Sequence, residues 1–143
     1  MATDRILVHE KVAEEFLETM KASLARAATE SSALPVVVSM AAKTRLQKTL
    51  SEAVASGAAI VSGSEKQNEV PGTSIVPTIL KDVDPSTTIW NEENFGPLVA
   101  ITTVKSDTQA VEIANSSTYG LSASVFTQDL RKGLAVAKEI QSG

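Results

Sequence analysis

The stretch that decides the fold is GPLVAITTVKSDTQAVEIANSS, Gly96 to Ser117. Its first part, Leu98 to Val104, is rich in β-forming residues and follows a Gly-Pro corner, which predicts a β-strand. Directly after it, Ser106 and Gln109 have the spacing of a helix capping box. The residues that follow therefore predict a helix, and a strand that leads into a helix is the repeating unit of an α/β fold.

The same alternation of strand and helix extends toward the N-terminus. Arg5 to His9 is a short β-forming run, and the residues after it carry apolar side chains at helical spacing. The predicted apolar stripe consists of Val12, Ala13, Phe16, Leu17, Met20 and Leu24. A second helix follows Pro35, and we predict that Ser39 caps its start and Gly57 ends it.

The predicted strands lie near Ile6 to Val8, Ala59 to Val61, Leu98 to Val104 and Ser122 to Phe126. SIVPTIL, residues 74–80, also favours an extended conformation, although Pro77 confines it to a sheet edge or an irregularity. Thr127 is the predicted N-cap of a last helix, and Gly143 its C-cap. The inward face of that helix is predicted to be Leu130, Leu134, Ala137 and Ile140. Together these elements predict an α/β three-layer sandwich: a mostly parallel sheet with helices on both faces.

Composition excludes several classes of function. The 143 residues are 43% hydrophobic, so the chain can bury the core of about one domain. Thirteen basic and 17 acidic residues give a net charge of −4 without a basic run, so no nucleic-acid or membrane partner is predicted. The chain has no cysteine, no signal-peptide pattern and no apolar run of the roughly 20 residues that a membrane span needs. We predict a cytoplasmic location, no metal site, and no function for the single histidine, His9.

Three motifs occur in order along the chain: PTIL (77–80), EENFGPLVAITTV (92–104) and NSSTYGLSASVFTQD (115–129). Together they resemble the catalytic domain of the aldehyde dehydrogenase superfamily, and the resemblance covers essentially the whole chain. It implies an oxidoreductase that uses NAD or NADP to oxidise an aldehyde to a carboxylic acid. The reaction passes through a thiohemiacetal and a thioester on a cysteine. A homo-oligomer is also implied.

The resemblance assigns cofactor binding to Glu93 and Phe95. Glu93 matches the family's Glu that hydrogen-bonds the nicotinamide ribose hydroxyls, and Phe95 matches the Phe that packs near the same ribose and ring. The chemistry suits these residue types, because an ionised carboxylate is acceptor-only and can take both hydrogens of a vicinal diol. Composition alone favours a solvated Glu92–Glu93 pair. We predict conformational roles for Asn91 and Asn94 and a structural corner at Asn115 to Leu121.

The beginning of the chain matches a further part of the family pattern. The family's nucleophile lies in G-Q-x-C-x-x-x-x-R, and Arg5 matches that arginine, so the cysteine would fall immediately before Met1. The prediction is a partial catalytic domain over residues 1–143, without catalytic residues, cofactor domain or C-terminal oligomerisation strand. By itself this chain is predicted to bind no cofactor and to oxidise no aldehyde. Two alternatives stay open: a short non-catalytic binding or assembly module with this fold, and an unrelated α/β domain with a chance EENFGP.

Overall fold

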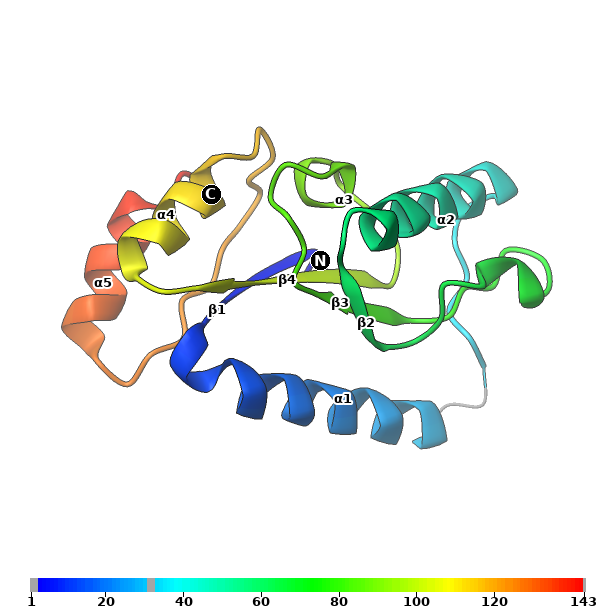
Figure 1. The fold of residues 1–143 in the computed structure, drawn as a ribbon, viewed down its shortest axis with the longest axis horizontal. Helices are drawn as coiled ribbons and strands as arrows, with labels where there is room; N and C mark the ends of the chain where they lie inside the picture. Colours follow the sequence, from blue (N-terminus) through cyan, green and yellow to red (C-terminus); the bar gives the residue numbers. More distant parts are fainter. Residues whose placement is uncertain (1–2, 31–32, 143) are drawn as a thin grey trace.

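A four-stranded β-sheet forms the middle layer of the computed structural model, which describes residues 3–30 and 33–142 (Figure 1). Its strands are β1 (Arg5–His9), β2 (Ala59–Ser62), β3 (Thr78–Lys81) and β4 (Leu98–Val104), in the order β1-β4-β3-β2. β4 pairs in parallel with both β1 and β3, whereas β2 pairs antiparallel with β3. The predicted mostly parallel sheet is confirmed.

Helices cover both faces of this sheet, as the sequence predicts. Figure 1 shows α1 on one face, and α2 and α3 on the other. The helices are η1 (Glu10–Val12), α1 (Ala13–Glu30), α2 (Met40–Ala55), η2 (Gln67–Glu69), α3 (Thr88–Asn91), α4 (Asp107–Asn115) and α5 (Leu130–Glu139). None of the helices in the described residues has the length and apolar character of a membrane crossing.

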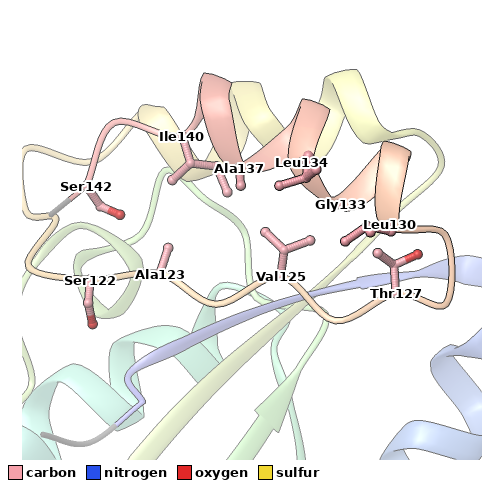
Figure 2. A pocket seen from close by; sticks show the side chains of 10 residues that line it. All are labelled: Ser122, Ala123, Val125, Thr127, Leu130, Gly133, Leu134, Ala137, Ile140 and Ser142. Carbon is pink, nitrogen blue, oxygen red and sulfur yellow. The ribbon is translucent and has the colours of Figure 1, made fainter.

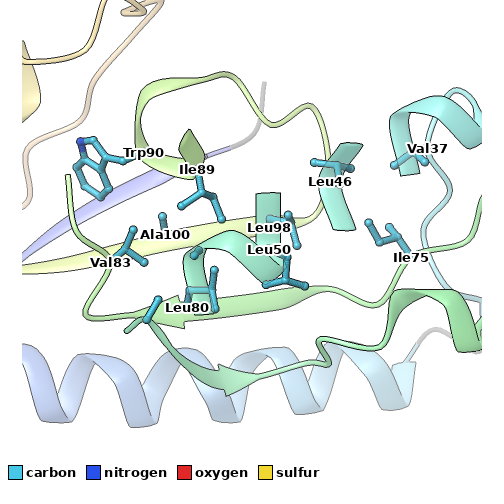
Figure 3. Close-up of a cluster of buried hydrophobic side chains, with 12 residues drawn as sticks. Val37, Leu46, Leu50, Ile75, Leu80, Val83, Ile89, Trp90, Leu98 and Ala100 are labelled. Atoms are coloured by element: carbon cyan, nitrogen blue, oxygen red, sulfur yellow. The ribbon is translucent and has the colours of Figure 1, made fainter. Parts of the chain in front are cut away.

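The core has one apolar cluster on each face of the sheet. The larger cluster lies beneath α2 and α3 and includes Leu46, Leu50, Leu80, Ile89, Trp90 and Leu98 (Figure 3). The smaller one joins Val8, Ile79 and Ile101 to the apolar stripe of α1. Successive residues of a strand point to opposite faces, so Ile79 and Leu80 contribute to different clusters. The predicted stripe packs here from Ala13 onward, but Val12 is 52% exposed.

The predicted starts of two helices are confirmed in atomic detail. Ser39 Oγ accepts a hydrogen bond from the Ala42 amide at 3.1 Å, and Ser106 Oγ accepts one from the Gln109 amide at 3.2 Å. The side chain of Gln109 reaches back to the Lys105 amide at 2.8 Å, one residue before the cap. Gly57 follows α2 with φ +105°, the left-handed conformation that ends a helix.

The start of α5 differs from the prediction. Asp129 is the N-cap, because its Oδ1 accepts a hydrogen bond from the Lys132 amide at 3.1 Å. Thr127 Oγ1 accepts instead from the Asp129 amide at 3.2 Å, so its hydroxyl shapes the turn before the helix. The predicted inward face of this helix is not buried, since Leu130 is 75% exposed and Leu134 is 55% exposed. The predicted C-cap, Gly143, lies outside the described residues.

The strand predicted at Ser122 to Phe126 is wrong. This stretch has no regular secondary structure, and Phe126 is 93% exposed. β-forming side chains favour a strand when they pack on neighbouring strands, and the described sheet ends at β1 without pairing to this stretch. The stretch instead forms one wall of an open apolar groove whose other wall is α5 (Figure 2).

Pro77 lies outside the sheet, directly before β3, and β3 is an interior strand, so the predicted sheet edge is wrong. β3 begins directly after Pro77, and the pairing register of the adjacent strand shifts between Ile60 and Ser62. Gly63 follows β2 with φ +102°, and a Cβ at this position would lie 2.4 Å from the Pro77 carbonyl oxygen. The two chain segments therefore touch where only a glycine fits. β2 is half-buried at the sheet edge.

Candidate cofactor-binding site

The loop of residues 92–97 connects α3 to β4 and carries both predicted site residues. Asn94 in its middle is fully buried, whereas Phe95 is 79% exposed and Glu93 is half-buried. The loop therefore holds itself to the protein through Asn94 and presents a carboxylate and an aromatic ring on either side of that anchor. Glu93 and Phe95 lie two positions apart in the chain, and their assignment to cofactor binding stays a prediction.

Phe95 has an unusual backbone conformation, with φ +49°. For a bulky L residue this region costs about 1–3 kcal/mol and persists only where the surroundings impose it. The sequence predicts that Gly96 and Pro97 form the corner, but the left-handed residue is Phe95. Gly96 is needed for close packing instead, since a Cβ there would lie 2.4 Å from Leu46 Cδ1.

Contacts from distant parts of the chain hold this loop. Arg45 on α2 donates hydrogen bonds to the Glu93 carbonyl at 3.3 Å and the Asn94 carbonyl at 2.6 Å. Asp4 Oδ2 accepts one from the Asn94 amide at 3.2 Å. The buried side chain of Asn94 donates to the Ile89 carbonyl at 3.3 Å. Asn94 is thus a structural anchor, and hydrogen bonds to charged groups are worth about 1.5–3 kcal/mol each, enough to offset the strain at Phe95.

The carboxylate of Glu93 has no hydrogen bond or ion pair with any other described residue. The Arg45 contact is to the Glu93 backbone, so both carboxylate oxygens can accept hydrogen bonds from a ligand. The adjacent exposed ring offers an apolar surface. The two hydroxyls of a diol can donate to such an acceptor, and a flat heteroaromatic ring can lie on the exposed phenyl ring, so nicotinamide ribose fits this pair of side chains.

The side chain of Arg5 forms hydrogen bonds with two segments that are far apart in the sequence, near Trp90 and at Ser117 to Tyr119. Its Nη1 donates to the Trp90 carbonyl at 2.8 Å and to Ser117 Oγ, and its Nη2 donates to the Tyr119 carbonyl at 3.3 Å. β1, the segment before the 92–97 loop and the N-x-x-x-Y-G corner therefore meet at one guanidinium.

The predicted corner at Asn115 to Leu121 is confirmed. Asn115 ends α4, and its side chain donates to the Glu139 carbonyl and accepts from the Gln141 amide, both at 2.8 Å. A Cβ on Gly120 would lie 2.8 Å from the Gln141 carbonyl oxygen, so the corner packs closely against the chain after α5. The side chain of His9 makes a local contact at the start of η1, where its Nδ1 accepts a hydrogen bond from the Lys11 amide at 3.2 Å.

Two hollows of the described structure lie away from this loop. The apolar groove of Figure 2 has a volume of about 460 Å³ and is lined by residues of α5 and residues 122–127. A second, polar hollow lies between the end of α2 and the start of α3. Near it, a hydrogen bond from the Ser86 amide lowers the pKa of the Asp84 carboxyl below its ordinary value. Within the described residues, no cluster of His, Cys, Asp or Glu could hold a metal.

The fold and the comparisons with known proteins together define the family to which the chain belongs. The model of the aldehyde dehydrogenase family matches residues 1–143, and the chain belongs to this family. This excludes the alternative of an unrelated α/β domain. The family acts on aldehydes and depends on NAD or NADP.

Individual relatives match over nearly the whole chain. The chain is 36% identical over 148 aligned residues to the chloroplastic betaine aldehyde dehydrogenase of Beta vulgaris, covering 99% of this chain and 30% of the relative. Succinate-semialdehyde dehydrogenase of Burkholderia pseudomallei has a similar structure, with a TM-score of 0.89, 29% identity, and coverage of 99% of this chain and 30% of that one. A betaine aldehyde dehydrogenase variant of Staphylococcus aureus in complex with NAD+ gives a TM-score of 0.84 at 26% identity, covering 97% and 30%.

Sequence reasoning missed Asp4 and Arg45. Their contacts with the loop span 90 and 48 positions, and no local pattern marks either residue.

Proposed function

We propose that this chain is the part of an aldehyde dehydrogenase catalytic domain that holds the nicotinamide ribose of NAD or NADP. The observation that carries the proposal is the loop at Glu93 and Phe95: an unpartnered carboxylate beside an exposed ring, on a backbone held at positive φ. The NAD+ complex of the Staphylococcus aureus relative supports the choice of cofactor.

The proposed role of the two side chains is to orient the cofactor. Glu93 accepts hydrogen bonds from both ribose hydroxyls, and Phe95 limits the movement of the attached ring. Bound NAD or NADP supplies the hydride acceptor for oxidation of an aldehyde to a carboxylic acid. Fixing one face of the ring toward the substrate lowers the entropic part of the barrier.

For the whole protein we propose only a class of substrate and the parts of the enzyme that lie outside residues 1–143. The chain spans 30% of the length of the relatives it matches, and we propose an aldehyde as the substrate class from the names of those relatives. We also propose that a nicotinamide-binding domain and the nucleophilic cysteine come from outside residues 1–143, which contain no cysteine. The cytoplasmic location stays a prediction, and the Beta vulgaris relative is described as chloroplastic.

The isolated 143-residue chain should neither bind NAD measurably nor oxidise aldehydes. One charged hydrogen bond is worth about 1.5–3 kcal/mol, whereas even millimolar affinity takes about 4.1 kcal/mol. The loop also lines neither the apolar groove beside α5 nor the polar hollow between α2 and α3. Titration calorimetry with NAD, and an absorbance assay for NADH with betaine aldehyde or succinate semialdehyde, check this. Micromolar binding, or NADH formation, would contradict it.

In a longer enzyme that contains this segment, Glu93→Gln should slow hydride transfer by roughly tenfold or more, which corresponds to about 1.4 kcal/mol. The amide keeps the shape of the side chain but loses the charge that strengthens the ribose hydrogen bonds. Single-turnover NADH formation measures this step. Glu92→Gln is the matched control, because Glu92 is the exposed neighbour and should leave the rate unchanged. An unchanged rate in Glu93→Gln would remove Glu93 from the proposed role.

We further propose that the isolated chain self-associates through the apolar groove beside α5. Large apolar side chains that line the groove are exposed: Val125 at 37%, Leu130 at 75% and Leu134 at 55%. Such surfaces favour association in water. Aldehyde dehydrogenases are generally oligomeric, which agrees with this proposal.

Sedimentation equilibrium at high protein concentration should show a species larger than a monomer, and the double variant Leu130→Asp, Leu134→Asp should shift it toward the monomer. Val38→Asp is the control, since Val38 is 97% exposed but lies directly before α2 rather than in the groove. A monodisperse monomer of the unmodified chain would contradict the proposal.

A further inference from the structure

We propose that Arg45 is a positioning residue for the cofactor-binding loop. Its guanidinium fixes two successive peptide groups, holds Phe95 in the left-handed conformation, and so directs Glu93 and Phe95 away from the protein. The effect of Arg45 on the loop conformation follows from its hydrogen bonds to the Glu93 and Asn94 carbonyls. The consequence for ribose binding rests on the proposed function.

The contacts fall on the peptide groups that determine the conformation of Phe95. The Asn94 carbonyl belongs to the peptide group between Asn94 and Phe95, and Arg45 Nη2 donates to it at 2.6 Å. Turning that peptide group would change the φ angle of Phe95, because its amide nitrogen lies in the same plane. A donor that fixes the carbonyl therefore fixes φ at its value of +49°.

The preceding peptide group is held from both sides. Arg45 Nη1 donates to the Glu93 carbonyl at 3.3 Å, and the Asn94 amide of the same group donates to Asp4 Oδ2 at 3.2 Å. Asp4 touches one of the two peptide groups, whereas Arg45 touches both. Arg45 is thus the contact whose loss would release the loop immediately before Phe95.

Arg45 is suited to this role by its chemistry and its place. The guanidinium is a planar fork with several fixed donors, so it can serve two carbonyls at once. It projects from α2, whose neighbouring side chain Leu46 is fully buried in the larger core cluster. The donor is therefore carried by one of the most firmly packed elements of the structure. Without it, Phe95 should relax toward negative φ, the region that L residues prefer.

The test is nuclear magnetic resonance spectroscopy of the isotope-labelled 143-residue chain. A residue at positive φ gives a strong intraresidue cross-relaxation signal between its amide and α protons, and Phe95 should show it. In Arg45→Met we expect this signal to fall to the level of ordinary loop residues. Exchange of the Asn94 amide with solvent should become roughly tenfold faster or more, the factor that corresponds to about 1.4 kcal/mol.

Two further variants sharpen the result. Arg45→Lys keeps a charge that can serve one carbonyl at a time, so it should keep part of the Phe95 signal. Lys48→Met is the matched control, because Lys48 lies on the same helix and its ion pair with Glu52 is exposed. It should leave both readouts unchanged.

Retention of the Phe95 signal and of slow Asn94 exchange in Arg45→Met would overturn the inference. If Arg45→Met loses the amide signals of β4 and has not folded, Arg45→Gln decides by the same two readouts. No cofactor takes part in this experiment. Its failure would remove Arg45 from the loop without affecting the proposed role of Glu93, which the hydride-transfer test addresses separately.

Discussion

Gly63→Ala should lower the free energy of unfolding by about 2–6 kcal/mol, the sum of backbone strain and overpacking. Gly63 has φ +102°, which side chains with a Cβ rarely adopt, and the added Cβ would lie 2.4 Å from the Pro77 carbonyl oxygen and 2.6 Å from Thr78 Cα. Both atoms belong to the backbone at the start of β3, in the interior of the sheet. They cannot move without disturbing that strand.

Gly57→Ala is the matched control for this variant. Gly57 has nearly the same φ, +105°, but a Cβ there would meet no atom within 4 Å. Gly57→Ala should therefore lower the free energy of unfolding only by the cost of the backbone strain, about 1–2 kcal/mol. Urea unfolding followed by circular dichroism measures both variants. Equal losses at the two glycines would show that the contact with Pro77 and Thr78 has no energetic weight.

Leu50→Ala should lower the free energy of unfolding by about 2–5 kcal/mol. Leu50 is fully buried between α2 and the sheet, in the larger core cluster (Figure 3). Truncation removes apolar contacts and leaves a cavity that the surrounding strands cannot fill. The same urea experiment measures the loss.

Leu134→Ala provides the comparison for Leu50. Leu134 is 55% exposed on α5, so its truncation should cost less than about 1 kcal/mol. A large loss at Leu134 would mean that the groove is covered in solution. A small loss at Leu50 would mean that α2 does not pack on the sheet as described.

Much of the fold could be predicted because its signals are local. The cap at Ser39, the end of α2 at Gly57 and the strand at Leu98 to Val104 each depend on a few neighbouring residues. The errors arise where local preference competes with distant packing. Ser122 to Phe126 has the composition of a strand, but the described sheet offers it no pairing. At the start of α5, Thr127 and Asp129 are both good caps, and the turn between them decides which one the helix uses.

The candidate site divides in the same way. The motif EENFGP identifies Glu93 and Phe95, because its residues are adjacent in the sequence and resemble the pattern of a known family. The positive φ of Phe95 and the burial of Asn94 have no comparable signal in the sequence, because both depend on contacts with the distant residues Arg45 and Asp4. Family resemblance thus identifies the residues that face a ligand, whereas their supporting contacts require coordinates.

The pairing of β1 with β4 has a consequence for synthesis on the ribosome. β1 is made well before the strand it pairs with, because its parallel register joins Arg5 to Ala100. At translation rates of about 5–20 residues per second, β1 waits roughly 5–20 s for that partner. During this interval the apolar side chains of β1 and α1 have no sheet to cover them. The nascent chain should therefore be a substrate for chaperones that bind exposed apolar segments until β4 has been made.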